Sequence, residues 1–433
     1  MIDALALIFV IVFAIGLRFA TGSWFHPSTV FASAWAIFLA APVVLLPGID
    51  PYPNASLFIA ALVLVSALGA TFRVRASEVV KHDISSSPWL TRFALAGFFT
   101  GLGAAILNLE SNGRSFIQAL SGDSLIASSQ AMTAARYNGS LVSSPVATFL
   151  LALTYGAALV APFAAQHSRR WLNAMILAAP SAGGAAYALL TTARAGLLIA
   201  ASISLAAWMV VKGVREGGRP RVSLGQIAPL LVAGGAVAAF FLVTAANRYG
   251  GVAYVDESTL RRTVGIYAGA STPALAAWLP GDGNLGLGIY SFSGISSFFV
   301  LPGTLKDTVF TDIGAYVSSN VYTAFRPLVE DFTLPGALGL VAVASITASV
   351  CFRRSVVSGR VGPALFTSVW LSYVLFSQSA SIFTFTNVVV GLIIACLLIL
   401  RFATFTPAPD SARPDTDENP QRLAPVLEGG RRA

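Results

Sequence analysis

Eleven long apolar runs separated by short polar turns dominate this sequence of 433 residues. A bilayer offers the backbone no water, so each crossing must be a helix of about 20 apolar residues whose own hydrogen bonds satisfy its peptide groups. The composition agrees, because 56% of the residues are hydrophobic and only 11% are charged. We therefore expect an all-α polytopic membrane protein with spans at 4–20, 29–47, 55–72, 92–109, 144–165, 171–191, 195–211, 225–245, 334–352, 362–378 and 380–400.

The distribution of basic residues predicts the orientation of these spans, because cytoplasmic loops carry an excess of Lys and Arg. When alternate loops are assigned to opposite faces, one face collects 19 of the 27 basic residues and the other collects 8. We therefore expect the N-terminus outside the cytoplasm and the C-terminus inside it. Residues 1–403 form the predicted transmembrane domain. Residues 404–433 are rich in Pro and charge, which predicts a disordered cytoplasmic tail.

Two outer segments are longer than a helical hairpin requires. The first covers about 110–143 and has a helix-like middle at 124–136, and the second covers about 246–332. Within the second, 264–279 and 285–301 are apolar but rich in Gly, Ser, Thr and Pro. Two interpretations stay open for these stretches: short re-entrant or interfacial helices, or a further pair of crossings that would raise the count from 11 to 13.

No ionisable residue falls in the middle of a predicted span, because all 19 acidic residues lie in loops or at span ends. Ion-coupled carriers often place a carboxylate near the membrane midplane, so this pattern disfavours such a carrier. The sequence has no metal-ligand cluster, phosphate-binding loop or basic nucleic-acid surface, and its two cysteines, Cys351 and Cys396, lie in apolar runs. We expect no cofactor, no metal and no nucleic-acid partner.

Arginines on the outer face oppose the usual sidedness of positive charge, and a guanidinium offers a fork of donors matched to phosphate oxygens. Arg194 is the strongest candidate, because it lies in a very short turn between two spans at the level of the lipid headgroups. The structural alternative is an interfacial anchor. Arg136 and Arg248 border outer helix ends, and Arg262 follows Arg261 in the long loop. For Arg136 and Arg248 a solvated position in a loop is an equally good explanation. Arg261 and Arg262 are weaker candidates, because they follow Asp256 and Glu257 and a pairing of charges on a helix surface also explains them.

The densest outer cluster is Asn-Val-Tyr-Thr-Ala-Phe-Arg-Pro-Leu-Val-Glu-Asp-Phe at 320–332, directly before the ninth span. It brings an amide, a phenol, a hydroxyl, a guanidinium and two carboxylates to the mouth of the membrane. Such a set can bind sugar hydroxyls and phosphate and can supply a general base. A structural interpretation also stays open, in which Tyr322 and Phe325 are interfacial aromatics and Glu330 and Asp331 cap the next helix.

Three features of the sequence together resemble the Wzy-type O-antigen polymerases. They are the plan of eleven spans with a long late outer loop, the Thr-Ala-Arg-Ala-Gly-Leu turn around Arg194, and the 320–332 cluster. The resemblance implies a metal-independent glycosyltransferase of the bacterial inner membrane. Such an enzyme transfers a growing glycan from undecaprenyl diphosphate to a hydroxyl of the next lipid-linked repeat unit on the periplasmic face. The implied partners are undecaprenyl-diphosphate-linked oligosaccharide, membrane lipids and a protein that regulates chain length.

The resemblance also gives each candidate residue an expected role. Arg194 and Arg326 would bind the diphosphate, with Arg326 in the catalytic set, and lesser contacts would come from Arg136, Arg248 and Arg262. Asp331 is the first candidate base and Glu330 the second. Sugar contacts would come from Asn320, Tyr322 and Thr323.

Two alternative functions stay open at the level of the sequence. An O-antigen ligase-type glycosyltransferase differs in its acceptor, and the ligases are associated with an outer-face histidine. Here His26, His82 and His167 all map to the predicted cytoplasmic side, which favours a polymerase. A flippase or transporter for a lipid-linked sugar is the alternative from another functional class.

Overall fold

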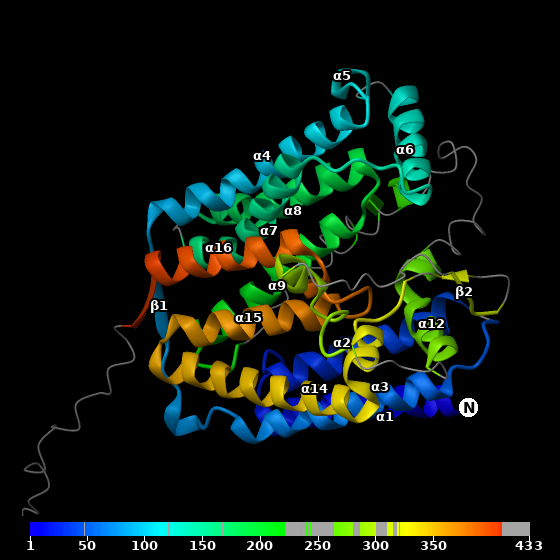
Figure 1. Ribbon diagram of the computed structural model, residues 1–433. Helices are drawn as coiled ribbons and strands as arrows, with labels where there is room; N and C mark the ends of the chain where they lie inside the picture. Colours follow the sequence, from blue (N-terminus) through cyan, green and yellow to red (C-terminus); the bar gives the residue numbers. More distant parts are fainter. Residues whose placement is uncertain are drawn as a thin grey trace, which may run out of the picture.

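The computed structural model describes residues 1–46, 48–119, 122–166, 169–220, 235, 239–240, 242–244, 264–279, 286–299, 310–314, 318–319 and 321–408. Long helices lie side by side in one bundle (Figure 1). Within the described ranges, eight helices are long and apolar enough to cross a membrane: α1 (Ile2–Thr21), α2 (Pro27–Leu45), α3 with its extension η1 (Pro53–Phe72), α4 (Pro88–Ser111), α7 (Pro145–Ala164), α8 (Arg170–Thr191), α9 (Ala195–Arg215) and α14 (Phe325–Ser358).

Two shorter apolar helices, α15 (Val361–Phe376) and α16 (Thr386–Phe402), complete the described bundle. The prediction of a helical, membrane-embedded chain is therefore confirmed, and ten predicted spans coincide with described helices. The predicted span at 225–245 lies largely outside the described residues.

The remaining described elements are short and lie at the two ends of the bundle (Figure 1). One end carries α5 (Phe116–Ala119), α6 (Gly122–Tyr137), α12 (Ser271–Trp278) and β2 (Thr311–Asp312), and we call it the mouth end. The other end carries β1 (His82–Ser86) and β4 (Ala403–Pro407), and we call it the strand end. The helix predicted at 124–136 is present as α6. Smaller elements are η2 (Ala76–Glu78), α13 (Ser293–Ser296), η4 (Ser297–Phe299), β3 (Ser318–Ser319) and η5 (Ile382–Thr384).

Two small antiparallel sheets accompany the helices. Strand β1 pairs with β4, with His82 opposite Pro407 and Ser86 opposite Ala403, and β2 pairs with β3. The first residues of the predicted disordered tail, 404–407, are therefore ordered in β4. The backbone N–H and C=O groups of these two segments need hydrogen-bond partners where the helices next to them end, and the pairing of β1 with β4 supplies those partners.

Small residues let several helices approach to backbone contact. A Cβ added to Gly183 of α8 would lie 2.3 Å from the carbonyl oxygen of Gly97 in α4, and one added to Gly391 of α16 would lie 2.2 Å from that of Ala152 in α7. A Cβ on Gly184 would lie 2.8 Å from the Gly196 carbonyl oxygen, so α8 and α9 touch beside their connecting turn. Close approach at small residues is typical of membrane helices.

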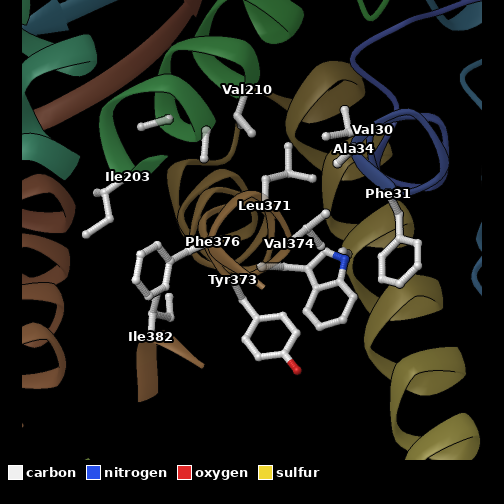
Figure 2. Close-up of a cluster of buried hydrophobic side chains, with 14 of the residues drawn as sticks. Val30, Phe31, Ala34, Ile203, Val210, Leu371, Tyr373, Val374, Phe376 and Ile382 are labelled. Carbon is white, nitrogen blue, oxygen red and sulfur yellow. The ribbon is translucent and has the colours of Figure 1, made fainter. Parts of the chain in front are cut away.

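Helix α15 is surrounded by the rest of the bundle. Viewed close up, its side chains Leu371, Val374 and Phe376 meet neighbours from α2 and from α9, including Val30 and Val210 (Figure 2). An apolar surface around the whole helix fits this central position.

Phe325 anchors the start of α14 in the core. It is fully buried, and its ring centroid lies 4.9 Å from that of Trp35 in α2. Eight residues later Thr333 has a φ of 64°, which breaks the helix before the membrane-spanning part begins. The segment from Phe325 to Phe332 therefore forms a separate short helix at the mouth end, which carries much of the predicted polar cluster.

The segments 264–279 and 286–299 form short helices at the mouth end, which supports the first of the two interpretations left open by the sequence. Helix α12 has 8 residues and α13 has 4, too few for a crossing. Glycines in the first segment lie directly on α2, since a Cβ added to Gly269 would be 2.9 Å from Pro42 and one added to Gly265 would be 2.5 Å from Leu46.

Candidate functional site

Arg194 lies in the tight turn between α8 and α9. Its side chain is buried, with only 5% of the residue exposed. The guanidinium carbon Cζ lies 4.4 Å from the ring centroid of Tyr267, in the segment that leads into α12. A guanidinium over an aromatic face is held by the negative quadrupole of the ring. The arginine therefore points into the protein at the mouth end instead of snorkelling to the surface.

Arg136 of α6 holds the turn that carries Arg194. Its Nη2 donates a hydrogen bond to the Thr191 carbonyl oxygen at 3.0 Å, and its Nη1 donates to that of Thr192 at 3.3 Å. These are carbonyl groups at the C-terminus of α8, where a positive charge is favourable. Thr192 has a φ of 58°, so the turn is also conformationally strained. Arg136 therefore stabilises the backbone turn that carries Arg194.

Arg326 forms an aromatic and ionic cluster on the short helix of α14. Its Cζ lies 4.1 Å from the ring centroid of Tyr322 and 5.4 Å from that of Trp278 in α12. Its Nε lies 3.4 Å from Oε1 of Glu330, one turn later, and the two side chains are 11% and 16% exposed. A guanidinium held between aromatic rings and one carboxylate keeps its planar donor fork in a fixed orientation.

Segment 264–279 contacts both Arg194, which is buried, and Arg326, which is mostly buried. Tyr267 contacts Arg194, and Trp278 contacts Arg326. Tyr267 lies before α12, which begins at Ser271, and Trp278 is the last residue of that helix. One segment therefore supplies an aromatic contact to both guanidinium groups. Neither aromatic residue was predicted as part of the site, although both lie in the 264–279 stretch that the sequence singles out.

Asp331 is fully buried and organises the loop before α13. Its Oδ2 accepts a hydrogen bond from the Ser291 backbone N–H at 2.6 Å, and its Oδ1 accepts from that of Tyr290 at 3.2 Å. Gly286 is required nearby, because an added Cβ would lie 2.3 Å from Oδ1. A carboxylate with both oxygens bonded to backbone donors is placed to hold a loop. This placement favours Glu330 over Asp331 as the base.

Tyr322 and Thr323 are also engaged within the protein. The Tyr322 hydroxyl hydrogen-bonds with that of Thr311 in β2, and its ring belongs to a small buried cluster with Leu46 and Ala274. Thr323 is 1% exposed, and its Oγ1 accepts from the Phe325 N–H at 3.3 Å. The sugar contacts expected of these two residues stay a prediction. Arg248, Arg262 and Asn320 lie outside the described residues.

A neutral polar cavity of about 310 Å³ opens at the mouth end between α4, α7, α8 and α16. Its lining includes the amides of Asn108 and Asn387 and the hydroxyls of Tyr187 and Thr386. Asn108 is 2% exposed, and its Nδ2 donates to the Tyr187 hydroxyl at 3.0 Å. A Cβ on Gly196 would lie 3.2 Å from the Tyr187 ring, so the cavity borders the Arg194 turn. Amides, hydroxyls and an aromatic face suit a carbohydrate.

An apolar cavity of about 290 Å³ lies beside the short helix, between α14 and α15. Leu328, Phe366 and Trp370 contribute to its lining, and Ser291, whose N–H binds Asp331, forms part of its wall. Phe366 is 44% exposed, so the cavity reaches the surface that faces lipid in a membrane-embedded chain. A hydrocarbon chain is the ligand that such a lining suits.

Histidine and metal chemistry receive no support from the described part of the chain. His26 and His82 lie at the strand end, where the His82 Nε2 donates to the Val356 carbonyl oxygen at 2.9 Å. Across the same residues, no group of three or more His, Cys, Asp or Glu side chains is arranged to hold a metal ion.

Comparison of the chain with protein-family models, curated proteins and solved structures gives no match.

Proposed function

We propose that this chain is a metal-independent glycosyltransferase that joins undecaprenyl-diphosphate-linked oligosaccharide repeat units on the periplasmic face of a bacterial inner membrane, as the Wzy-type polymerases do. The observation that carries the proposal is a pair of guanidinium groups at the mouth end, the buried Arg194 and the mostly buried Arg326, each held on an aromatic ring of segment 264–279. Fixed guanidinium groups recognise phosphate without a metal ion. In this proposal the mouth end faces the periplasm.

The two cavities fit the other parts of such a substrate. The neutral cavity beside Tyr187 borders the Arg194 turn and has the hydroxyl and amide lining that binds sugar. The apolar cavity between α14 and α15 has the lining that accommodates a polyprenyl chain. A lipid-linked oligosaccharide has these three parts: a hydrocarbon chain, a diphosphate and a glycan.

Glu330 is the proposed base. The acceptor hydroxyl oxygen attacks the anomeric carbon of the donor glycan, and the bond from that carbon to the diphosphate oxygen breaks. The hydroxyl proton passes to the Glu330 carboxylate, and the electron pair of the broken bond stays on the diphosphate, whose added charge Arg194 and Arg326 stabilise. The ion pair between Arg326 and Glu330 must open for this step, because the diphosphate takes the place of the carboxylate beside the guanidinium.

Purified protein in detergent tests the proposal when it is given undecaprenyl-diphosphate oligosaccharide. A polymerase yields lipid-linked dimers and longer products, which mass spectrometry resolves by their mass ladder. A flippase yields no longer product, and this outcome refutes the proposal. Lipid A core added beside the repeat units identifies a ligase, because glycan then appears on the core.

A further inference from the structure

A second polar cavity lies at the strand end, remote from the site proposed above. Its volume is about 370 Å³, and its walls come from residues 19–22 at the end of α1, residues 73–75 between η1 and η2, and Arg219 after α9. Three arginines, Arg73, Arg75 and Arg219, belong to this lining.

The backbone directs these arginines to one place. Arg73 and Arg75 both have an extended backbone, with ψ angles of 152° and 153°, and both line the cavity on either side of Val74. Val74, between them, is 3% exposed and packs against Gly218, where an added Cβ would lie 3.1 Å from the valine Cγ2. This contact fixes the chain just before Arg219 beside the pair.

Two of the guanidinium groups also contact the last turn of α1. Nη1 of Arg73 donates to the Ala20 carbonyl oxygen at 2.8 Å. Gly22 ends the helix with a φ of 72°, and a Cβ there would lie 3.3 Å from Nε of Arg219. Glycine is required at this position both for the left-handed conformation and for the approach of the arginine.

The charged side chains in the described lining of the cavity are all positive. No carboxylate belongs to the lining formed by the described residues. Glu78, three residues after Arg75, lies outside this lining, and its Oε2 accepts hydrogen bonds from the Arg75 backbone N–H at 3.2 Å and from Arg353 Nε at 3.1 Å. Three guanidinium groups around one cavity suit an anion with several oxygens, such as a phosphate group.

An exposed apolar stripe on α1 leads to this cavity. Its members are spaced alternately three and four residues apart, which puts them on one helix face, and each is between 46% and 81% exposed: Leu5, Ile8, Val12, Ile15 and Phe19. Phe19, the most exposed of them, also lines the cavity. A ligand with a phosphate group and a hydrocarbon chain matches both surfaces at once.

We propose that the cavity at the strand end binds the phosphate headgroup of an anionic membrane lipid, with its acyl chain along the α1 stripe. The stripe favours a lipid over a free phosphate ion, because only a lipid has a hydrocarbon chain that can pack against an apolar surface. This site is independent of the proposed glycosyltransferase activity, and either can be refuted without the other.

Native mass spectrometry of the purified full chain, titrated with phosphatidylglycerol, tests this site. The variant is Arg75→Gln with Arg219→Gln, and Arg73 is kept because it also holds the end of α1. The matched control, Arg354→Gln with Arg360→Gln, removes two exposed arginines at the strand end that do not line the cavity. We expect the cavity variant to bind phosphatidylglycerol about 25-fold more weakly, at roughly fivefold per arginine, and the control to bind as the wild type does.

Three outcomes would overturn the proposal. Equal losses in the cavity variant and the control would mean that general surface charge attracts the lipid. Equal binding of phosphatidylcholine would remove the anionic selectivity. Equal binding of inorganic phosphate would identify a free anion as the occupant. Unchanged melting temperatures of both variants establish that each remains folded.

Discussion

The Nε atom of Arg326 lies 3.4 Å from Oε1 of Glu330, one helical turn further along the short helix at the mouth end. The guanidinium proposed to bind the diphosphate and the carboxylate proposed to take the acceptor proton therefore neutralise each other before substrate arrives. In the proposed reaction, binding of the diphosphate separates the two roles. It occupies the guanidinium and leaves the carboxylate available as a base.

Replacement of Arg326 is expected to stop glycan elongation. Arg326→Ala removes the positive group that is proposed to face the departing diphosphate, and we expect a rate loss of about 100-fold or more. Arg326→Lys keeps the charge but loses the planar fork, and we expect roughly a tenfold loss, the size of one charge-assisted hydrogen bond. Elongation of lipid-linked units in detergent measures both. Arg114→Ala, at an exposed mouth-end arginine, is the control, and normal rates in both Arg326 variants would refute this role.

Replacement of Glu330 and of Asp331 by the corresponding amides is expected to have different effects on activity and stability. Glu330→Gln should abolish elongation and lower the melting temperature less than Asp331→Asn does, because Glu330 is 16% exposed whereas Asp331 is fully buried. Asp331→Asn should lower stability by about 1–3 kcal/mol, since an amide N–H₂ would face one of the backbone donors of Tyr290 and Ser291. Thermal unfolding and elongation rates, measured on both variants, check this. The reverse pattern would identify Asp331 as the base.

Arg136 is expected to affect activity through stability of the α8–α9 turn. Arg136→Met removes two hydrogen bonds to carbonyl groups at the end of α8, which we expect to cost about 1–2 kcal/mol and to slow elongation. Arg136→Lys should recover part of both. A methionine at Arg114 is the matched control. Loss of activity with an unchanged melting temperature would point instead to direct contact between Arg136 and substrate.

Gly183 is expected to tolerate no side chain. Gly183→Ala would place a Cβ 2.3 Å from the Gly97 carbonyl oxygen, which forces α4 and α8 apart. We expect this variant to give little folded protein by size-exclusion chromatography. Gly16→Ala in α1 is the control, because no atom lies within 4 Å of the added Cβ. Equal yields of folded protein from the two variants would contradict the backbone contact between these helices.

Acid is expected to destabilise the chain through His26. Burial lowers the pKa of this histidine to about 3, whereas the unfolded chain has the ordinary value near 6.5. The unfolded state therefore binds more protons between these values, and stability falls as the pH drops below about 6.5, by about 2 kcal/mol at pH 5. His26→Leu should remove this part of the pH dependence, which denaturation at pH 7 and pH 5 measures. Identical pH slopes for the variant and the wild type would refute it.

The sequence predicted the features that follow from local hydrophobicity. The helices, the mouth-end position of Arg194 and Arg326, and the break before residue 334 all follow from where apolar runs begin and end. The contacts of the site depend on tertiary packing instead. Burial of Asp331 arises from a loop some 40 residues earlier in the chain, and Arg136 meets α8 only because α6 folds back onto it. The periodicity of single helices carries no information about such contacts.

The central claim is that Arg194 and Arg326 together bind the diphosphate of a lipid carrier, and direct binding of undecaprenyl diphosphate to purified protein tests it. We predict that Arg194→Gln with Arg326→Gln weakens binding by about 100-fold or more, whereas Arg114→Gln leaves it unchanged. Equal affinity of the double variant and the wild type would contradict the claim.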